Sequence, residues 1–260
     1  MRSIAFGAIL AFLPALSTQP AQAANGPVRD LITCRQVAET APAEALILVK
    51  DWLDHGGTDD ARLCQALAYF SAGDFAAAGQ AFENLATIGD GKNAGQLANL
   101  FNRAAWGWLR AGDTKRADRL YTRALERTPD DGDIRLDRGI ARTEAKRYRD
   151  AIEDFTEVLK RHPRRADAYF YRAVAWRALE DLRNALADVE QALRLKPNDA
   201  ESQILRGTIR ALGGDSTGAR LDWREVAARD PGSPAAKAAA ANLARLERVD
   251  NSRPAKKTIP

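Results

Sequence analysis

Prolines that recur every 34 residues constrain the fold of this chain more than any other feature. They are Pro129, Pro163, Pro197 and Pro231. An alanine column, a small-residue column and a bulky column keep the same phase: Ala117, Ala151, Ala185 and Ala219; Ala105, Gly139, Ala173 and Gly207; Tyr121, Phe155, Val189 and Trp223. A fixed period of this length indicates a repeat architecture, in which each unit packs on its neighbours.

Each copy of the repeat is predicted to form two helices. In the copy at 166–199, residues 167–179 are the first predicted helix, Glu180 and Asp181 the turn, and 182–195 the second helix. Pro197 ends the pair, because proline cannot continue a helix. The abundance of alanine, leucine and arginine also favours helix and argues against a β-sandwich or barrel.

This pattern resembles the tetratricopeptide repeat family. The matching residues are clearest in the copy at 166–199, and they are Tyr169, Ala173, Trp176, Ala185, Ala192 and Pro197. The resemblance implies an all-α fold, a right-handed α-solenoid of helix-turn-helix repeats. Five copies are predicted within 59–233, at 59–92, 98–131, 132–165, 166–199 and 200–233.

The segments that flank the repeats are predicted to complete the solenoid. Residues 24–58 are interpreted as a degenerate helix pair. Residues 234–248 are predicted to be a helix that starts with a proline and covers the open face of the last repeat. Residues 249–260 are expected to be a disordered tail, since they offer no core.

Residues 1–23 are predicted to be a signal peptide. A ten-residue apolar run, Ile4–Leu13, follows Arg2 and ends at Pro14, and Ala21–Ala23 fits the small-x-small cleavage rule. The run spans only about 15 Å as a helix, half the hydrocarbon core of a bilayer. The alternatives are an uncleaved anchor and a buried helix. We therefore expect an exported, periplasmic protein whose mature chain has no membrane span.

The two cysteines, Cys34 and Cys64, are predicted to form a disulfide in the oxidising compartment that export implies. The bridge would tie the leading helix pair to the copy at 59–92, where the repeat pattern is weakest. Closing a loop of about 31 residues is worth roughly 3–4 kcal/mol on the chain-entropy estimate. The alternative is two buried free thiols.

Three arginine–aspartate pairs are predicted from a comparison of the copies. Arginine precedes the small column and aspartate follows sixteen residues later, as Arg138 and Asp154, Arg172 and Asp188, and Arg206 and Asp222. In the copy at 98–131 both positions change together, to Ala104 and Leu120. We expect bidentate ion pairs between the two helices of one repeat, each worth about 0–1 kcal/mol if exposed. The alternative is solvated charges without contact.

The resemblance also implies a concave binding face lined by the first helices of the repeats. The residues carried over to that face are Leu63, Leu67, Phe70, Asn102, Trp106, Leu109, Leu136, Ile140, Phe170, Val174, Ile204 and Thr208. This mostly apolar groove suits an amphipathic helix or an apolar peptide, with Trp106 and Phe170 as anchors. A clamp for a terminal carboxylate is not expected, since Asn102 alone fits that set. The alternatives are a groove filled by the chain's own termini and a dimer.

No catalytic residues, metal site or cofactor are expected. His55 and His162 are assigned to a helix end and a turn, and the sequence has no Cys/His cluster, phosphate loop or nucleophile elbow. We expect a non-catalytic scaffold or adaptor of the cell envelope that binds another protein or peptide. Without residues 1–23, 38 basic residues face 35 acidic ones, which argues against nucleic acid. The alternatives are an anion- or polymer-binding module and a regulatory subunit of an envelope enzyme.

Overall fold

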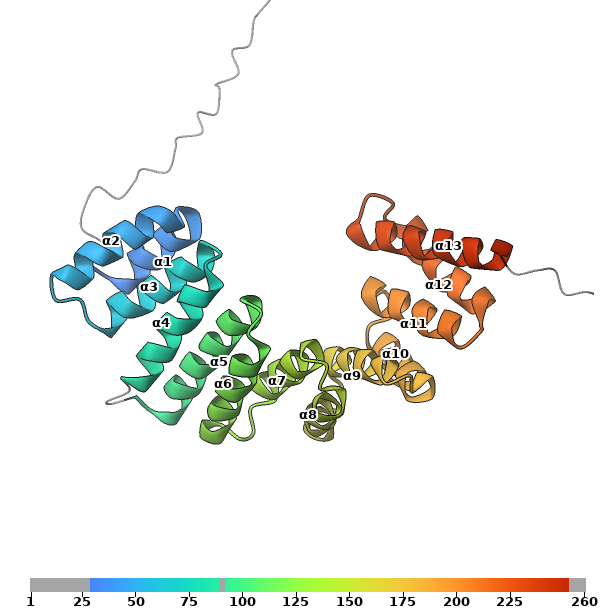
Figure 1. Cartoon of the computed structure of the whole chain (residues 1–260), viewed down its shortest axis with the longest axis horizontal. Coiled ribbons are helices and arrows are strands. Elements are labelled where there is room, and N and C mark those ends of the chain that lie inside the picture. The colour runs from blue at the N-terminus through green and yellow to red at the C-terminus, as the bar shows by residue number, and fades with distance from the viewer. Residues whose placement is uncertain (1–28, 89–91, 253–260) are drawn as a thin grey trace, which may run out of the picture.

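The computed structural model describes residues 29–88 and 92–252, and within them the chain forms thirteen α-helices and no strand (Figure 1). The helices are α1 Leu31–Thr40, α2 Pro42–Asp54, α3 Asp59–Ser71, α4 Phe75–Thr87, α5 Ala94–Arg110, α6 Thr114–Arg127, α7 Gly132–Glu144, α8 Tyr148–Arg161, α9 Ala166–Ala178, α10 Leu182–Leu195, α11 Ala200–Leu212, α12 Ser216–Arg229 and α13 Pro234–Ser252. The all-α helical repeat solenoid predicted from the sequence is confirmed.

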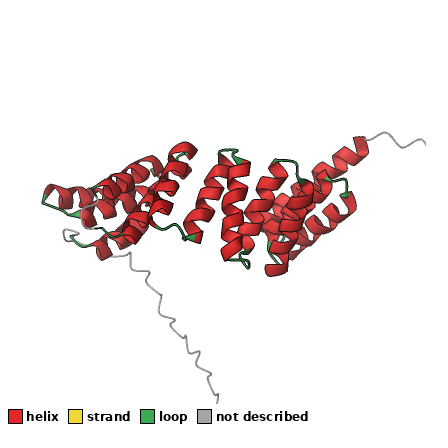
Figure 2. Ribbon diagram, turned by 90° about the horizontal axis from the view of Figure 1, so that it is seen from below, coloured by secondary structure: helices red, strands yellow, loops and turns green. Residues whose placement is uncertain are grey.

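Consecutive helices form antiparallel pairs that stack side by side along the chain. Figure 1 shows the stack as a wide arch, with α1–α4 on one arm, α11–α13 on the other and α7–α8 at its base. Figure 2, turned by 90°, shows the pairs following one another along the long axis. The helices that are neighbours in sequence are also neighbours in space, so each pair is stabilised mainly by the pairs next to it.

The turn inside each helix pair has a fixed local design. A residue with a positive φ angle precedes the second helix: Gly73, Gly112, Lys146, Glu180 and Gly214, with φ between 60° and 87°. An aspartate then caps α4, α6, α10 and α12 by accepting a hydrogen bond from the backbone three residues on. Arg147 holds the same position before α8, where no side chain caps the helix.

The small-residue column brings the two helices of a pair into close contact. A Cβ atom on Gly139 would lie 2.5 Å from the ring of Phe155, and one on Gly207 would lie 2.5 Å from that of Trp223. Both rings are buried, and Trp223 Nε1 donates a hydrogen bond to the carbonyl of Ile204 at 3.1 Å. Glycine is therefore needed at these positions because the bulky column fills the space a side chain would take.

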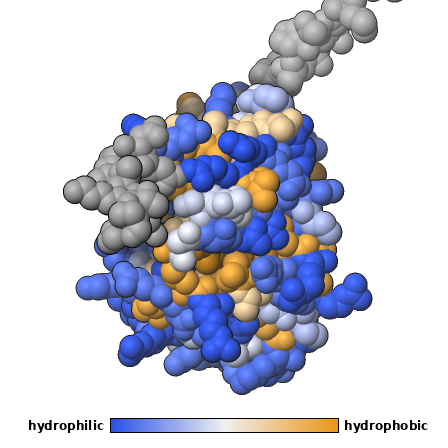
Figure 3. Space-filling model, turned by 90° about the vertical axis from the view of Figure 1, so that its right-hand side faces the viewer, coloured by the Kyte–Doolittle hydropathy of each residue, from blue (hydrophilic) through white to orange (hydrophobic). Residues whose placement is uncertain are grey.

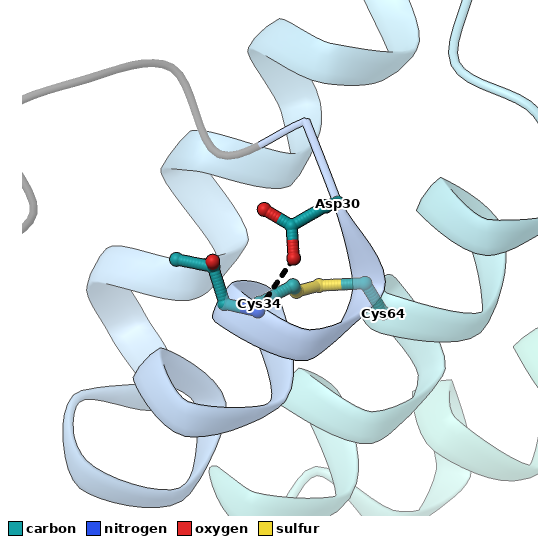
Figure 4. The surroundings of a disulfide bond; sticks show 4 residues. Asp30, Cys34 and Cys64 are labelled. Atoms are coloured by element: carbon teal, nitrogen blue, oxygen red, sulfur yellow. Dashed lines mark hydrogen bonds between the residues drawn. A yellow bond between two sulfur atoms is a disulfide. The ribbon is translucent and has the colours of Figure 1, made fainter.

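The leading helices are joined to the repeats by a disulfide between Cys34 of α1 and Cys64 of α3 (Figure 4). Both cysteines are buried, and Val49, Trp52 and Ala61 belong to the same apolar cluster. Asp30 caps α1 through its side chain, which accepts from the Thr33 amide at 2.8 Å. The structure thus contains the cysteine pair that the sequence predicts.

The opposite end is covered by α13. Its alanines Ala235, Ala236 and Ala239 face inward, and Ala239 packs in one cluster with Trp223 and Val226 of α12. Seen from this end, apolar surface lies in the middle of the molecule and hydrophilic side chains surround it (Figure 3).

Two boundaries differ from the predicted ones. The helix α5 begins at Ala94, ahead of the copy predicted at 98–131, because Asn93 and Gln96 form a capping box that starts it earlier. The helix α13 continues to Ser252, so the tail predicted at 249–260 is helical over its first four residues.

Three further sequence predictions fall wholly or partly outside the described residues. These are the signal peptide at 1–23, the first residues of the segment 24–58 and the tail from residue 253. Among the helices that the structure describes, none has the length and apolarity needed to cross a bilayer.

Candidate functional site

Two adjoining hollows lie along the first helices of the N-terminal pairs. The larger has a volume of about 490 Å³, and its lining residues are Leu31, Arg35, Asp59, Asp60, Leu63, Leu67, Leu85, Lys92, Gln96, Asn99, Leu100 and Arg103. The smaller has a volume of about 280 Å³, and its lining residues are Leu67, Phe70, Phe82, Asn102, Arg103, Trp106 and Asp137. Because Leu67 and Arg103 line both, we treat the two as one surface, the N-terminal hollow.

The structure brings five of the twelve predicted groove residues together in the N-terminal hollow. They are Leu63, Leu67, Phe70, Asn102 and Trp106. Trp106 is 38% exposed although it is a large aromatic residue, which makes it the most accessible member of this group. A large apolar side chain that remains accessible beside a hollow is typical of a contact surface.

The other seven predicted residues lie elsewhere and have other partners. Leu109 and Leu136 are buried in the core. Phe170 lines a separate, small hollow of about 170 Å³ with polar neighbours. The remaining four pack within the later repeats or bond locally: Ile140 beside α8, Val174 beside α10, Ile204 in the cluster with α13, and Thr208, whose hydroxyl donates to the Ile204 carbonyl.

Sequence reasoning missed the polar wall of the N-terminal hollow. Arg103 and Asp137 follow the predicted column residues Asn102 and Leu136 by one position and are themselves 34 residues apart. This spacing was the available signal, since it repeats at the period of the fold. In the larger part of the hollow, Lys92 Nζ lies 2.5 Å from a carboxylate oxygen of Asp59. The hydrogen bonds from Lys92 and Arg62 lower the pKa of Asp59.

Asp137 lies in the smaller part of the hollow and is mostly buried. The pKa of Asp137 is raised to about 6, mainly by burial and also by the charges of Asp133 and Asp131, while Arg165 opposes the shift. The Tyr121 hydroxyl, which is buried on α6, has its pKa raised by burial and by the charge of Asp137. The negative charge of Asp137 is thus only weakly balanced by positive charges of the protein.

The three predicted arginine–aspartate pairs are ion pairs in the structure. Arg138 donates from Nε and Nη2 to the two carboxylate oxygens of Asp154, at 3.0 and 2.6 Å. Arg172 does the same to Asp188, at 2.7 and 2.8 Å, and Arg206 donates to Asp222 at 2.6 to 3.1 Å. Contact with Asp222 raises the pKa of Arg206.

The low energy expected for exposed ion pairs does not apply here, because Asp154, Asp188 and Asp222 are all buried. Two of the three arginines also reach the preceding repeat. Arg138 Nη1 donates to the Thr122 hydroxyl at 3.2 Å, and Arg172 Nη1 donates to the Thr156 hydroxyl at 3.0 Å. Arg138 and Arg172 therefore each join the two helices of their own repeat to the repeat before it.

The chain matches known proteins in family and in fold. The sequence profile described as tetratricopeptide repeat matches residues 103–148, 136–200 and 177–234, which together cover just over half of the chain. A comparison with curated protein sequences finds no match.

Several solved structures have the same fold at low sequence identity. PilW, described as a widely conserved type IV pilus biogenesis factor, is 17% identical, with a TM-score of 0.64 over 80% of this chain and 96% of that one. YrrB is 20% identical, with a TM-score of 0.54 over 67% and 90%. MamA is 14% identical, with a TM-score of 0.53 over 72% and 97%. By its repeats, its profile matches and its fold, this chain belongs to the tetratricopeptide repeat family.

Proposed function

We propose that this protein is a non-catalytic interaction scaffold of the cell envelope, and that it binds a peptide or helix of another protein in the N-terminal hollow. The observation that carries the proposal is the accessible apolar floor formed by Leu63, Leu67, Phe70 and Trp106 from two successive first helices. Apolar anchors on parallel helices with polar residues at the rim suit a segment laid along the groove.

Two observations support the envelope as the place of action. The predicted signal peptide at 1–23 would export the chain. The disulfide between Cys34 and Cys64 is of the kind that persists in oxidising compartments. YrrB is described as having an unusual peptide-binding site, but at 20% identity that likeness carries the fold, so the proposal rests on the hollow itself.

Ion pairing of the arginines with carboxylates disfavours the alternative that the protein binds anions. Arg138, Arg142, Arg172, Arg206 and Arg210 each contact a carboxylate. An arginine held by a carboxylate contributes little positive potential toward a phosphate polymer.

The test is selection of random twelve-residue peptides on the immobilised full chain, followed by binding to Trp106→Asp. We expect the selected peptides to lose at least about ten-fold in affinity, because a charge in the apolar floor must be desolvated when the peptide binds. Leu221→Asp is the matched control, since Leu221 is an exposed leucine on α12, far along the chain from the hollow. Equal binding to both variants, with unchanged circular dichroism, would overturn the proposal.

A further inference from the structure

The smaller part of the N-terminal hollow contains acceptor groups that the protein leaves without a donor. Within the described residues, Asp137 takes part in no hydrogen bond and no ion pair. The side-chain oxygen of Asn102, which lines the same space, is buried and has no hydrogen-bond partner. Buried polar atoms nearly always have partners in folded proteins, so the Asn102 oxygen calls for a donor from outside, and the partly exposed Asp137 carboxylate beside it is a second acceptor for the same ligand.

Among the described residues, neither of the two arginines closest to this space forms an ion pair with Asp137. Arg103 lines the same space, where it donates from Nε to Asn99 at 2.8 Å and its guanidinium lies 5.9 Å from the centre of the Phe82 ring. Arg165, which moderates the pKa of Asp137, pairs with Asp133 at 2.5 Å and with Asp167 at 2.6 Å. The carboxylate of Asp137 is therefore left free to take a cation from a ligand.

The walls of the same space are aromatic. Phe70, Phe82 and Trp106 line it together with Asp137 and Asn102. The faces of aromatic rings attract cations, most strongly where water is excluded, and they also pack against the methylene groups of a long basic side chain. An aromatic wall with a carboxylate and an amide oxygen at its end is complementary to such a side chain and repels an acidic one.

We propose that this part of the hollow holds a lysine or arginine side chain of the bound peptide, with the cation at Asp137 and Asn102 and the methylene groups against Phe70 and Trp106. The inference rests on the proposed function and names the chemistry of its partner. The larger part of the hollow, with Leu63 and Leu67, would take an apolar side chain of the same peptide. The Asn102 amide can rotate about χ2 to turn its oxygen toward the cation.

The test uses the peptides selected on the full chain. We expect them to share one basic residue close to an apolar one. Replacing that basic residue with glutamine should lower affinity by about ten-fold or more, because a charged hydrogen bond is lost. Asp137→Asn should weaken the parent peptide by a similar factor and leave the glutamine peptide nearly unchanged.

The outcomes separate this inference from the proposed function. If the peptides depend on Trp106 but show no basic residue and no response to Asp137→Asn, the hollow binds peptides and the inference is wrong. If the peptides do not depend on Trp106, the proposed function itself fails. Asp230→Asn is the matched control, because Asp230 is an exposed acid that follows α12 and lies outside the hollow.

Discussion

Asp154 and Asp137 belong to the same helix pair, α8 and α7, yet their surroundings are opposite. Asp154 is buried between repeats and receives hydrogen bonds from Arg138 and Arg142. Asp137 lies in the N-terminal hollow with no ion pair of its own and a pKa raised by burial. A buried charge that the protein pairs serves the fold, whereas an unpaired one costs stability, which is consistent with the ligand contact proposed for Asp137.

The largest expected effect is the loss of stability when an arginine that pairs with a buried aspartate is removed. Arg172→Ala should lower the free energy of unfolding by about 3 kcal/mol or more, because Asp188 would be left as a buried charge without a partner. Arg138→Ala should cost less, since Arg142 still pairs with Asp154 at 2.8 Å. Urea denaturation followed by circular dichroism measures both. A loss as small as that of the exposed control Arg183→Ala would show that these pairs do not stabilise the fold.

The disulfide is expected to have the next largest effect. The double variant Cys34→Ser, Cys64→Ser should lose roughly 3 kcal/mol of stability, because the bridge closes a loop that spans 30 positions. Since α1 supplies Leu31 and Arg35 to the hollow, peptide affinity should fall as well. Thermal unfolding and peptide titration test this. An unchanged melting temperature would contradict the stabilising role of the bridge.

A smaller effect is expected for the pH dependence of peptide binding at the unpaired Asp137. For a peptide with a basic residue, affinity should fall about ten-fold between about pH 7 and pH 5. The pKa of Asp137 is about 6, so the carboxyl is charged at the higher pH and mostly neutral at the lower one. The charged or titratable groups that interact with Asp137 or line its part of the hollow are Arg103, Tyr121, Asp131, Asp133, Arg165 and Tyr171. The pH dependence should disappear in Asp137→Asn, and its persistence there would assign it to another group.

The smallest effect concerns the buried hydroxyl of Tyr121, which has no hydrogen-bond partner in the described part of the chain. Tyr121→Phe should leave stability unchanged or raise it by up to about 1 kcal/mol, because a polar group without a partner is removed from the core. Chemical denaturation measures the change. A loss of stability would mean that the hydroxyl is bonded in solution.

The period of 34 residues was enough to predict a stack of repeated units, because each column of the repeat reports a contact that recurs, and the resemblance to tetratricopeptide repeats implied the α-solenoid. The Arg172–Asp188 pair could be predicted for the same reason, since both residues change together between copies. The burial of Asp188 could not, because exposure depends on how one repeat covers the next. The sequence indicates which residues share one face of a helix, but it does not indicate how strongly the stack of repeats curves.

The candidate site was predicted only in part for the same reason. Leu67 and Trp106 follow from the inner column, and both line the hollow. The predicted groove was uniform along the chain, whereas Ile204 packs against the end of the solenoid where α13 covers it. Asp137 is one position away from the column, and its importance comes from the absence of a partner among the described residues, which no single sequence can show.

The most direct test compares the stability and the peptide affinity of Asp137→Asn with those of the unmodified chain. The two quantities should change in opposite directions. Stability near pH 7 should rise, on the order of 1 kcal/mol after allowance for partial exposure, because an uncompensated charge is removed. Affinity for the selected basic peptide should fall about ten-fold. If stability and affinity fall together, Asp137 supports the fold rather than a ligand, and the central claim is contradicted.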